Sequence, residues 1–194
     1  MPGQGRPRST DVDAAIHRAT LEILDRAGYP GLSIEAVARH AGVGKPSVYR
    51  RFRSRAELAF ATLMHGLAPD PAPDTGSLRD DLRALLAGLA QRLSAPLTRR
   101  AMPSLVGELH DDPRLLARFA DTFVAHQRRT IAVVLDRAVV RGELTRRPDI
   151  EVVQALLVGP VYSWLFVLGE QPPADSVRII ADIVAAGLRS AGHE

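Results

Sequence analysis

The sequence predicts an all-α protein of about nine helices. Apolar residues recur every three or four positions along nearly the whole chain, a spacing that places them on one face of a helix. Residues that begin and end helices separate these periodic segments, and we find no alternating stretch long enough for a strand. With 194 residues, 46% of them hydrophobic, the chain is long enough to bury a core of its own.

The first two predicted helices lie between residues that commonly flank helices. Ser9 or Thr10 is expected to cap a helix over about 11–27, because serine and threonine oxygens accept hydrogen bonds from the free N–H groups of a first turn. Ser33 is the expected N-cap of a second helix, which Gly42 ends after about two turns.

The next two predicted helices are also short. Pro46 fits the first turn of a third helix, where its missing N–H removes no hydrogen bond. Val48 and Phe52 lie one turn apart, so both are expected to point inward. Ser54 and Glu57 have the spacing of a capping box and open a fourth helix.

A proline-rich break over 68–76 divides the chain. Three prolines and a glycine in this stretch disfavour both helix and strand. Ser77 then caps a strongly periodic, leucine-rich helix that Pro96 ends. The sequence therefore predicts two domains, one over 9–68 and one over 77–194.

The remaining helices are expected to form a bundle in the second domain. A weaker helical segment over about 98–109 is interrupted by Pro103 and Gly107. Three longer helices follow it, over about 113–142, 149–168 and 173–190.

The stretch 152–168 contains no charged residue and approaches the length of a membrane span. Gln154, Gly159 and Pro160 lie inside it and disfavour a membrane location. A helix that is apolar on all sides must still be covered, and a second copy of the same helix pair is the simplest cover. We therefore predict a homodimer through the last two helices, with burial inside one chain as the alternative.

Positive charge is concentrated at the start of the chain. Residues 1–55 contain ten basic and five acidic side chains, whereas the remainder contains fifteen basic and seventeen acidic ones. A basic head on a mildly acidic body is typical of proteins that bind a polyanion such as nucleic acid. A solvated, arginine-rich helix face is the alternative explanation.

The composition excludes several classes of chemistry. The chain has no cysteine, which excludes disulfides, a thiolate nucleophile and cysteine-bound zinc. It has no glycine-rich phosphate loop and no Gly-x-Ser-x-Gly turn, and nothing near Ser104 would activate that hydroxyl, so we do not expect an enzyme. The basic N-terminal stretch lacks the apolar run of a secretory signal, so a cytoplasmic location is expected.

Five residues in the middle of the chain are of metal-binding types. No pair of them has the one-turn spacing of a helical metal site, and Asp112 before Pro113 is explained as an N-cap. We therefore expect no metal and no other cofactor. The five residues are His65, His110, Asp111, Asp112 and His126.

Residues 33–52 have the pattern of a helix-turn-helix motif. Ala38 is small enough for two helices to approach closely, and Gly42 permits a positive φ in the turn between them. Such a motif presents its second helix to the major groove of DNA. The outward face of that helix is rich in hydrogen-bond donors, and a solvated face is again the alternative. These donors are Lys45, Ser47, Tyr49, Arg50 and Arg51.

The first 60 or so residues resemble the DNA-binding domain of the TetR family of transcriptional regulators. The segments 141–144, 157–160 and 187–188 also resemble the C-terminal domain of one TetR subfamily. Gly44 departs from the family pattern, which usually has a serine or threonine there, and Pro46 stands where a small residue is common. The residues that carry the N-terminal resemblance are Gly28, Tyr29, Ser33, Val37, Ala38, Ala41, Gly42, Val43, Val48, Tyr49, Phe52, Arg55 and Leu58.

The resemblance implies a homodimeric regulator, most often a repressor, that binds double-stranded DNA at a palindromic operator. By position, phosphates would be bound by Ser33, Lys45, Tyr49 and Arg55. Bases would be contacted by Pro46, Ser47 and Arg50, with Arg51 a further donor on the same helix. The arm with Arg6 and Arg8 would reach a minor groove or add only salt-dependent affinity.

The resemblance also implies an effector pocket among the middle helices. Its apolar candidates favour a small hydrophobic or amphipathic ligand, although a stripe of leucine and phenylalanine is also what a plain core requires. A helical protein-interaction module with a basic head remains the alternative function. The candidate pocket residues are Phe60, Met64, Leu86, Leu89, Met102, Leu105, Phe119, Phe123 and Tyr162.

Overall fold

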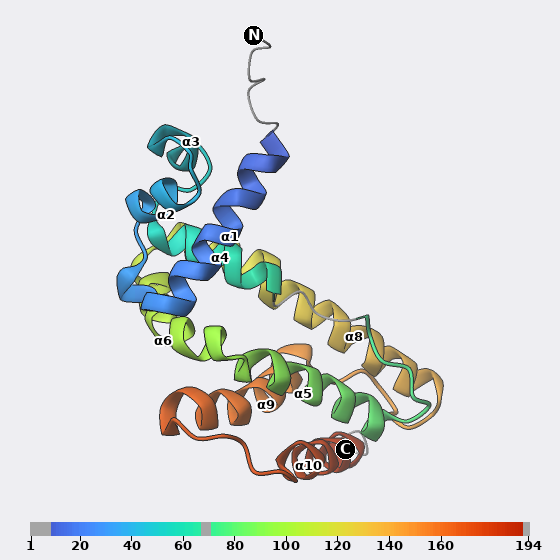
Figure 1. Cartoon of the computed structure of the whole chain (residues 1–194). Coiled ribbons are helices and arrows are strands. Elements are labelled where there is room, and N and C mark those ends of the chain that lie inside the picture. The colour runs from blue at the N-terminus through green and yellow to red at the C-terminus, as the bar shows by residue number, and fades with distance from the viewer. Residues whose placement is uncertain (1–8, 67–70, 192–194) are drawn as a thin grey trace. The chain divides into compact units, whose positions relative to one another are not determined.

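The computed structural model describes residues 9–66 and 71–191, apart from the side chains of 9 and 64–66. Every regular element within these ranges is helical, which confirms the predicted all-α fold (Figure 1). The α-helices are α1 (Ser9–Ala27), α2 (Ile34–His40), α3 (Lys45–Tyr49), α4 (Arg55–Gly66), α5 (Leu78–Ser94), α6 (Pro96–Asp111), α7 (Pro113–Phe119), α8 (Ala125–Val140), α9 (Ile150–Tyr162) and α10 (Ser176–Ala191).

The helices form two compact units that do not follow the order of the sequence. Among the described residues, the first unit joins 9–66 to 96–115, and the second joins 71–95 to 116–191. Helix α6 therefore belongs with α1–α4, where it packs against α1 and α4. The chain passes from one unit to the other three times.

The first unit is built around α1, which packs against α2, α4 and α6. The Thr20 hydroxyl is buried in this helix and donates to the Ile16 carbonyl at 2.8 Å, so this buried polar group is paired. Helix α3 contributes one fully buried side chain, Val48, while Phe52 beyond its end is only half-buried. The largest fully buried side chains of this unit are Ile16, Leu24, Leu32, Val37, Val48, Leu58 and Leu105.

Most of the predicted caps are confirmed. The Ser33 and Ser77 hydroxyls accept from N–H groups three residues on, at 3.0 and 3.2 Å, and open α2 and α5. Ser54 accepts from the Glu57 N–H at 3.1 Å, as a capping box requires. The predicted cap of the first helix is wrong, because Ser9 and Thr10 already have helical backbone and lie inside α1.

Helix α6 is continuous, which corrects the predicted interruption at Pro103 and Gly107. Proline in a helix interior removes one backbone hydrogen bond, at a cost of about 3 kcal/mol. Both residues lie on the exposed side, while the opposite side of the helix is buried and packs against α1 and α4. Packing on that side outweighs the lost hydrogen bond. The buried side chains are Thr98, Ala101, Met102, Leu105 and Leu109.

The long helix that the sequence predicted after Asp112 begins within the first unit and lies mostly in the second. Asp112 caps it, since its Oδ1 accepts from the Arg114 and Leu115 N–H groups at 3.0 and 3.2 Å. The helix runs through α7 and α8, but a π-helical turn over Ala120–Val124 widens it between the two. The periodic pattern did not reveal this turn.

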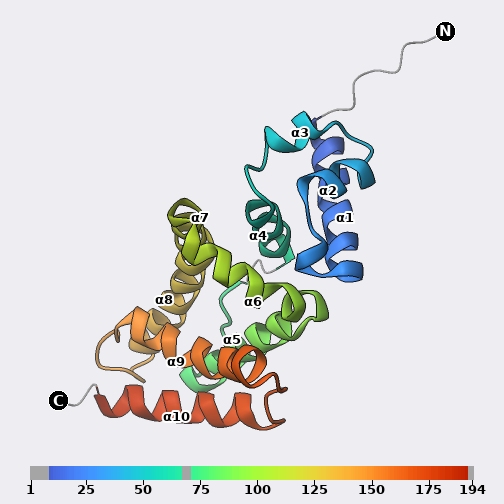
Figure 2. The ribbon, with the colours of Figure 1, turned by 90° about the vertical axis from the view of Figure 1, so that its left-hand side faces the viewer.

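Helices α9 and α10 complete the second unit and pack on α5 (Figure 2). Asp149 caps α9, and a second π-helical turn, Ser163–Leu168, extends it to Gly169, whose φ of 73° ends the helix. This confirms the predicted helix over 149–168. By length and composition, Ile150–Leu168 could also cross a membrane, and one side of it, with Val153, Leu157, Val161 and Leu165, is buried within the unit.

A buried carboxylate ties the linker to the end of α8. Asp81 is fully buried, and its Oδ1 accepts from the N–H and the hydroxyl of Thr75 at 2.7 and 2.8 Å. Its Oδ2 accepts from Arg141 at 3.0 Å, and Arg141 also binds Glu143 at 2.7 Å. The Glu143 carboxylate in turn accepts from the first N–H of α5, at Leu78, at 2.9 Å. Two N–H groups and a guanidinium are thereby satisfied away from water.

Candidate nucleic-acid interface

The turn between α2 and α3 has the predicted helix-turn-helix geometry. Gly42 has a φ of 67°, a conformation that a side chain would strain. The Val43 N–H donates to the Ala38 carbonyl at 3.0 Å and closes the turn. Val37 and Ala38 are buried beneath it. Small and apolar residues inside the turn therefore fix the direction in which α3 leaves it.

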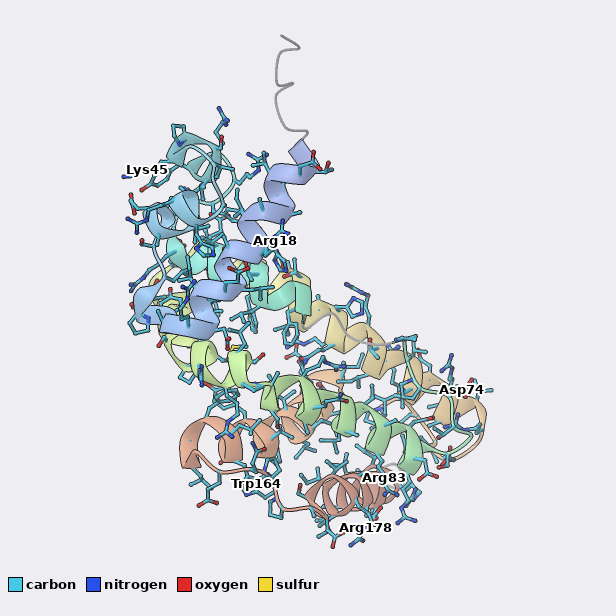
Figure 3. The ribbon with its side chains drawn as sticks, in the orientation of Figure 1. Arg18, Lys45, Asp74, Arg83, Trp164 and Arg178 are labelled. Atoms are coloured by element: carbon cyan, nitrogen blue, oxygen red, sulfur yellow. The ribbon has the colours of Figure 1, made fainter. Side chains whose placement is uncertain are left out.

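Helix α3 and the residue that follows it expose three of the predicted donors, Lys45, Tyr49 and Arg50, and Val48 anchors the helix. Lys45 and Pro46 form its exposed first turn, and Lys45 projects from the outer edge of the first unit (Figure 3). Tyr49 is 50% exposed. The exposed Arg50 guanidinium donates to the Ser47 hydroxyl at 3.1 Å, so these two candidate base contacts lie side by side. Gly44 provides no side-chain cap for this helix.

Glu35, in the first turn of α2, connects two of the predicted phosphate ligands. Its Oε1 lies 3.6 Å from Lys45 Nζ and accepts from the Tyr49 hydroxyl at 3.4 Å. A hydrogen bond from its own backbone N–H, and then the contacts of Lys45 and Tyr49, lower the pKa of Glu35. The sequence reasoning missed this residue, although an acidic side chain at a helix N-terminus is a readable signal.

Arg50 and Arg51 are adjacent but have different surroundings. Arg51 is only 23% exposed, binds Asp13 of α1 through Nε, and donates from Nη1 to the Ser47 carbonyl at 3.0 Å. It therefore ties α3 to α1. Arg50 stays on the open face with the remaining donors.

Arg55 at the start of α4 contacts α6. Its Nε and Nη2 donate to Glu108 Oε1 at 3.1 and 2.6 Å, and its guanidinium lies 4.9 Å from the centre of the Tyr29 ring. The hydrogen bond with Glu108 raises the pKa of Arg55, and burial, followed by Glu108, raises that of Tyr29. The predicted phosphate ligand is thus held by a carboxylate far away in sequence, which the sequence reasoning did not anticipate.

We expect Glu108→Gln to lower the free energy of unfolding by about 1 kcal/mol. The substitution keeps the shape of the side chain but removes the charge that Arg55 binds, and a half-exposed pair contributes about this much. Urea unfolding at a fixed protein concentration measures the change. Glu170→Gln is the control, because Glu170 is exposed and, among the described residues, its hydrogen bond is made by the backbone N–H and not by the carboxylate. Equal effects of both variants would show that the Arg55 contact adds nothing.

Two hollows of the second unit lie beside each other. One, of about 40 Å³, lies among α5, α8 and α9, and the other, of about 170 Å³, lies between α5, α8 and the linker. Leu86 and Leu89, two of the predicted pocket residues, line the first hollow.

The other predicted pocket residues lie elsewhere. Phe60, Met102 and Leu105 are buried in the first unit. Phe119 and Phe123 pair with each other, with ring centres 5.4 Å apart, and Tyr162 pairs with Phe166 at 4.9 Å. None of these lines either hollow. The Met64 side chain and the arm with Arg6 and Arg8 lie outside the described residues.

The described side chains form no group of three or more potential metal ligands. His110 Nδ1 lies 2.8 Å from the Val106 carbonyl one turn earlier. Asp112 is used as a helix cap. The His65 side chain lies outside the described residues.

Comparison with known proteins identifies both parts of the chain. Residues 16–62 match the family described as bacterial regulatory proteins, tetR family, and residues 72–184 match the tetracyclin repressor-like C-terminal domain. The uncharacterized HTH-type transcriptional regulator Rv1556 of Mycobacterium tuberculosis is 30% identical, across 98% of this chain and 93% of its own length. The DNA-binding transcriptional repressor TetR of Mycobacteroides abscessus is 29% identical, across 97% and 98%.

A solved structure agrees with these relatives. The TetR family transcription regulator SCO0332 superposes with a TM-score of 0.71 and 28% identity, across 91% of this chain and 98% of its own. All of these matches are to proteins described as regulators and not as enzymes. The chain belongs to the TetR family of transcriptional regulators, with a helix-turn-helix DNA-binding domain at its N-terminal end.

Proposed function

We propose that the protein is a cytoplasmic, homodimeric repressor that binds a palindromic operator and leaves it when a small hydrophobic ligand binds the second unit. The observation that carries this proposal is the open face of α3, where Lys45, Ser47, Tyr49 and Arg50 are presented while Val48 anchors the helix. Donors in this arrangement fit the phosphates and base edges of a major groove. A protein interface would not require them.

Dimerisation is supported by an apolar face on the last two helices. Val152 and Leu156 of α9 and Ile179 and Ile183 of α10 are exposed in the single chain. A two-fold interface would bury this face against the same face of a second copy. Two α3 helices placed about 34–36 Å apart would then reach successive major grooves.

We assign different roles to the residues of the DNA-binding face. On binding DNA, Lys45 and Tyr49 would exchange the Glu35 carboxylate for a phosphate. Arg55 would exchange the Glu108 carboxylate for another phosphate. Ser33 would offer a phosphate the N-terminal end of α2. The base contacts would come from Ser47 and Arg50, together with Pro46 against a thymine methyl group, while Arg51 would position α3.

The proposal is tested by selecting genomic DNA fragments with the purified protein over a series of salt concentrations. A short palindrome bound by a particle of twice the 21.0-kDa chain mass would support it. Salt-dependent binding without sequence preference would mean that the basic head binds DNA only through phosphates and the release of their counterions. That result, or a monomer that does not bind DNA, would favour a protein-interaction module instead.

We expect Arg50→Ala to relax the preference for one base pair in each half-site. An arginine that binds guanine contributes about 1–3 kcal/mol of discrimination, so the selected sequences would become degenerate at that position. Tyr49→Ala is the matched comparison, because loss of a phosphate contact would weaken binding about equally on all sequences. Selection of fragments with each variant measures both effects. If Arg50→Ala kept the full sequence preference, Arg50 would not read a base.

Release by a ligand is proposed from the hollows of the second unit. They lie among α5, α8 and α9, and α9 also carries part of the proposed dimer face. A ligand that binds better to one spacing of the α3 pair shifts the protein toward that spacing. If the ligand favours a distance between the two α3 helices that differs from one DNA turn, the protein would release the operator.

A further inference from the structure

Glu35 places a carboxylate among the donors of the DNA-binding face. It lies in the first turn of α2, and its side chain is 47% exposed. Its Oε1 atom faces both Lys45 Nζ, at 3.6 Å, and the Tyr49 hydroxyl, at 3.4 Å. Its own backbone N–H and then these contacts lower the pKa of Glu35, so the side chain is charged at neutral pH. Two of the proposed phosphate ligands therefore already share one anion.

The residues that are proposed to read bases are in a different situation. The Arg50 guanidinium donates to the neutral Ser47 hydroxyl at 3.1 Å, and it forms no ion pair with any other described residue. Arg55, another proposed phosphate ligand, is bound by the Glu108 carboxylate at 2.6 Å. Carboxylates are thus paired with the proposed phosphate contacts and not with the proposed base contacts.

A carboxylate and a phosphate compete for the same donors. Both are anions that accept hydrogen bonds from lysine and tyrosine. When a DNA phosphate binds Lys45 and Tyr49, the Glu35 carboxylate must turn away and lose both contacts. If it stayed beside the phosphate, the two anions would repel each other. In either case Glu35 lowers the affinity, and it does so for every base sequence, because phosphates are the same in all of them.

We infer that Glu35 is a built-in competitor of the DNA phosphate, which weakens binding to every sequence and leaves base reading by Arg50 unchanged. Non-specific binding depends almost entirely on phosphate contacts, and a genome offers a large excess of non-specific sites. The competitor therefore keeps more of the protein off those sites. The inference rests on the proposed function only in taking Lys45 and Tyr49 as phosphate ligands; it requires no palindrome and no effector.

Fluorescence anisotropy with two labelled DNA duplexes tests the inference. One duplex has a random sequence about three helical turns long, and the other contains the palindrome that the unaltered protein selects. Glu35→Gln keeps the shape of the side chain and removes its charge. We expect it to bind both duplexes about three- to ten-fold more tightly per bound chain at about 0.1 M salt, because an exposed ion pair and a nearby like charge have effects of this size. The ratio of the two affinities should not change.

The salt dependence of binding is a second measurement. In Glu35→Gln, the Lys45 charge is no longer balanced by a neighbouring carboxylate. The slope of the logarithm of the binding constant against the logarithm of the salt concentration should therefore become steeper by about 0.9 per bound chain, as for one further neutralised phosphate. A purely structural role of Glu35 would not change this slope.

A double-mutant cycle shows whether Glu35 acts through Lys45. Lys45→Gln should weaken DNA binding about three-fold more in the Glu35→Gln background than in the unaltered protein. The reason is that Lys45 gives up a carboxylate on binding DNA only where Glu35 is present. Equal losses in the two backgrounds would contradict the competition.

Asp25→Asn is the matched control for the lost negative charge. The Asp25 side chain is 75% exposed and lies 3.8 Å from Arg100. Asp25 lies about three turns, or about 18 Å, further along α1 than Asp13, which binds Arg51 beside α3. This distance exceeds the screening length of about 10 Å at 0.1 M salt, so both DNA affinities should stay the same. Thermal unfolding of every variant verifies that the fold is retained.

Three results for Glu35→Gln would overturn the inference. Unchanged binding would mean that the carboxylate does not compete, and weaker binding would mean that Glu35 positions Lys45 and Tyr49 for DNA. A changed ratio of the two affinities would mean that the carboxylate contacts a base.

The random duplex separates this inference from the proposed function. Tighter binding of that duplex by Glu35→Gln, without any selected palindrome, would sustain the competitor and contradict the proposed operator. A selected palindrome that both proteins bind equally would sustain the operator and contradict the competitor. Failure of both proteins to bind either duplex would overturn both.

Discussion

Replacing Ile183 with glutamate is expected to turn the protein into a monomer and to weaken binding to palindromic DNA by about 10²- to 10⁴-fold. Ile183 is 66% exposed on α10, within the proposed dimer face. A glutamate there would place a carboxylate in an apolar interface, where an unpaired charge is strongly unfavourable. Without the dimer, the second half-site loses the high effective concentration that a linked partner supplies. Light scattering and fluorescence anisotropy measure mass and affinity on the same sample.

Val140→Glu is the control for this substitution. Val140 is 87% exposed at the end of α8, outside the face formed by α9 and α10. The control should remain dimeric and bind the operator normally. A dimer that persists in both Ile183→Glu and Ile179→Glu would show that the exposed face serves another purpose.

Replacing Asp81 with alanine is expected to lower the free energy of unfolding by about 2–4 kcal/mol. The substitution leaves the Thr75 N–H without an acceptor. It also removes one of the carboxylates that bind Arg141. Arg141 keeps Glu143 and, at 3.6 Å, Asp74, so the effect stays below that of a guanidinium left alone. Urea unfolding at a fixed protein concentration measures it.

Asp136→Ala is the comparison for Asp81→Ala. Asp136 also binds an arginine, Arg147, at 3.2 Å, but both side chains are more than half exposed. Water already competes for such a pair, so the stability should change little. If the two variants were equally stable, burial of Asp81 would not contribute to the fold.

Local signals allowed much of the fold to be predicted. Ser33, Ser77 and Asp112 bind N–H groups two or three residues away, so short sequence windows contain the whole interaction. The turn at Gly42 is of the same kind, because its backbone conformation depends on one residue. The helix-turn-helix is therefore predictable from residues 33–52 alone.

Contacts between distant residues could not be predicted in this way. Arg55 and Glu108 are 53 positions apart, and Leu78 and Glu143 are 65 positions apart. In its own sequence window each of the two glutamates would be an ordinary surface residue, and only the packing of the helices brings it to the Arg55 side chain or to the Leu78 N–H. The Gln154 amide likewise donates to the Gln127 oxygen at 2.9 Å, across 27 positions of the sequence.

The place of α6 has a consequence for building hybrid regulators from this protein. The first unit is completed by a helix that comes 30 residues after α4 ends, and α1 and α4 both pack against it. A fragment cut in the proline-rich linker would leave those packing surfaces open to water. A transplanted DNA-reading head should therefore carry residues 96–115 with it, so a functional exchange between relatives needs two segments of coding sequence rather than one.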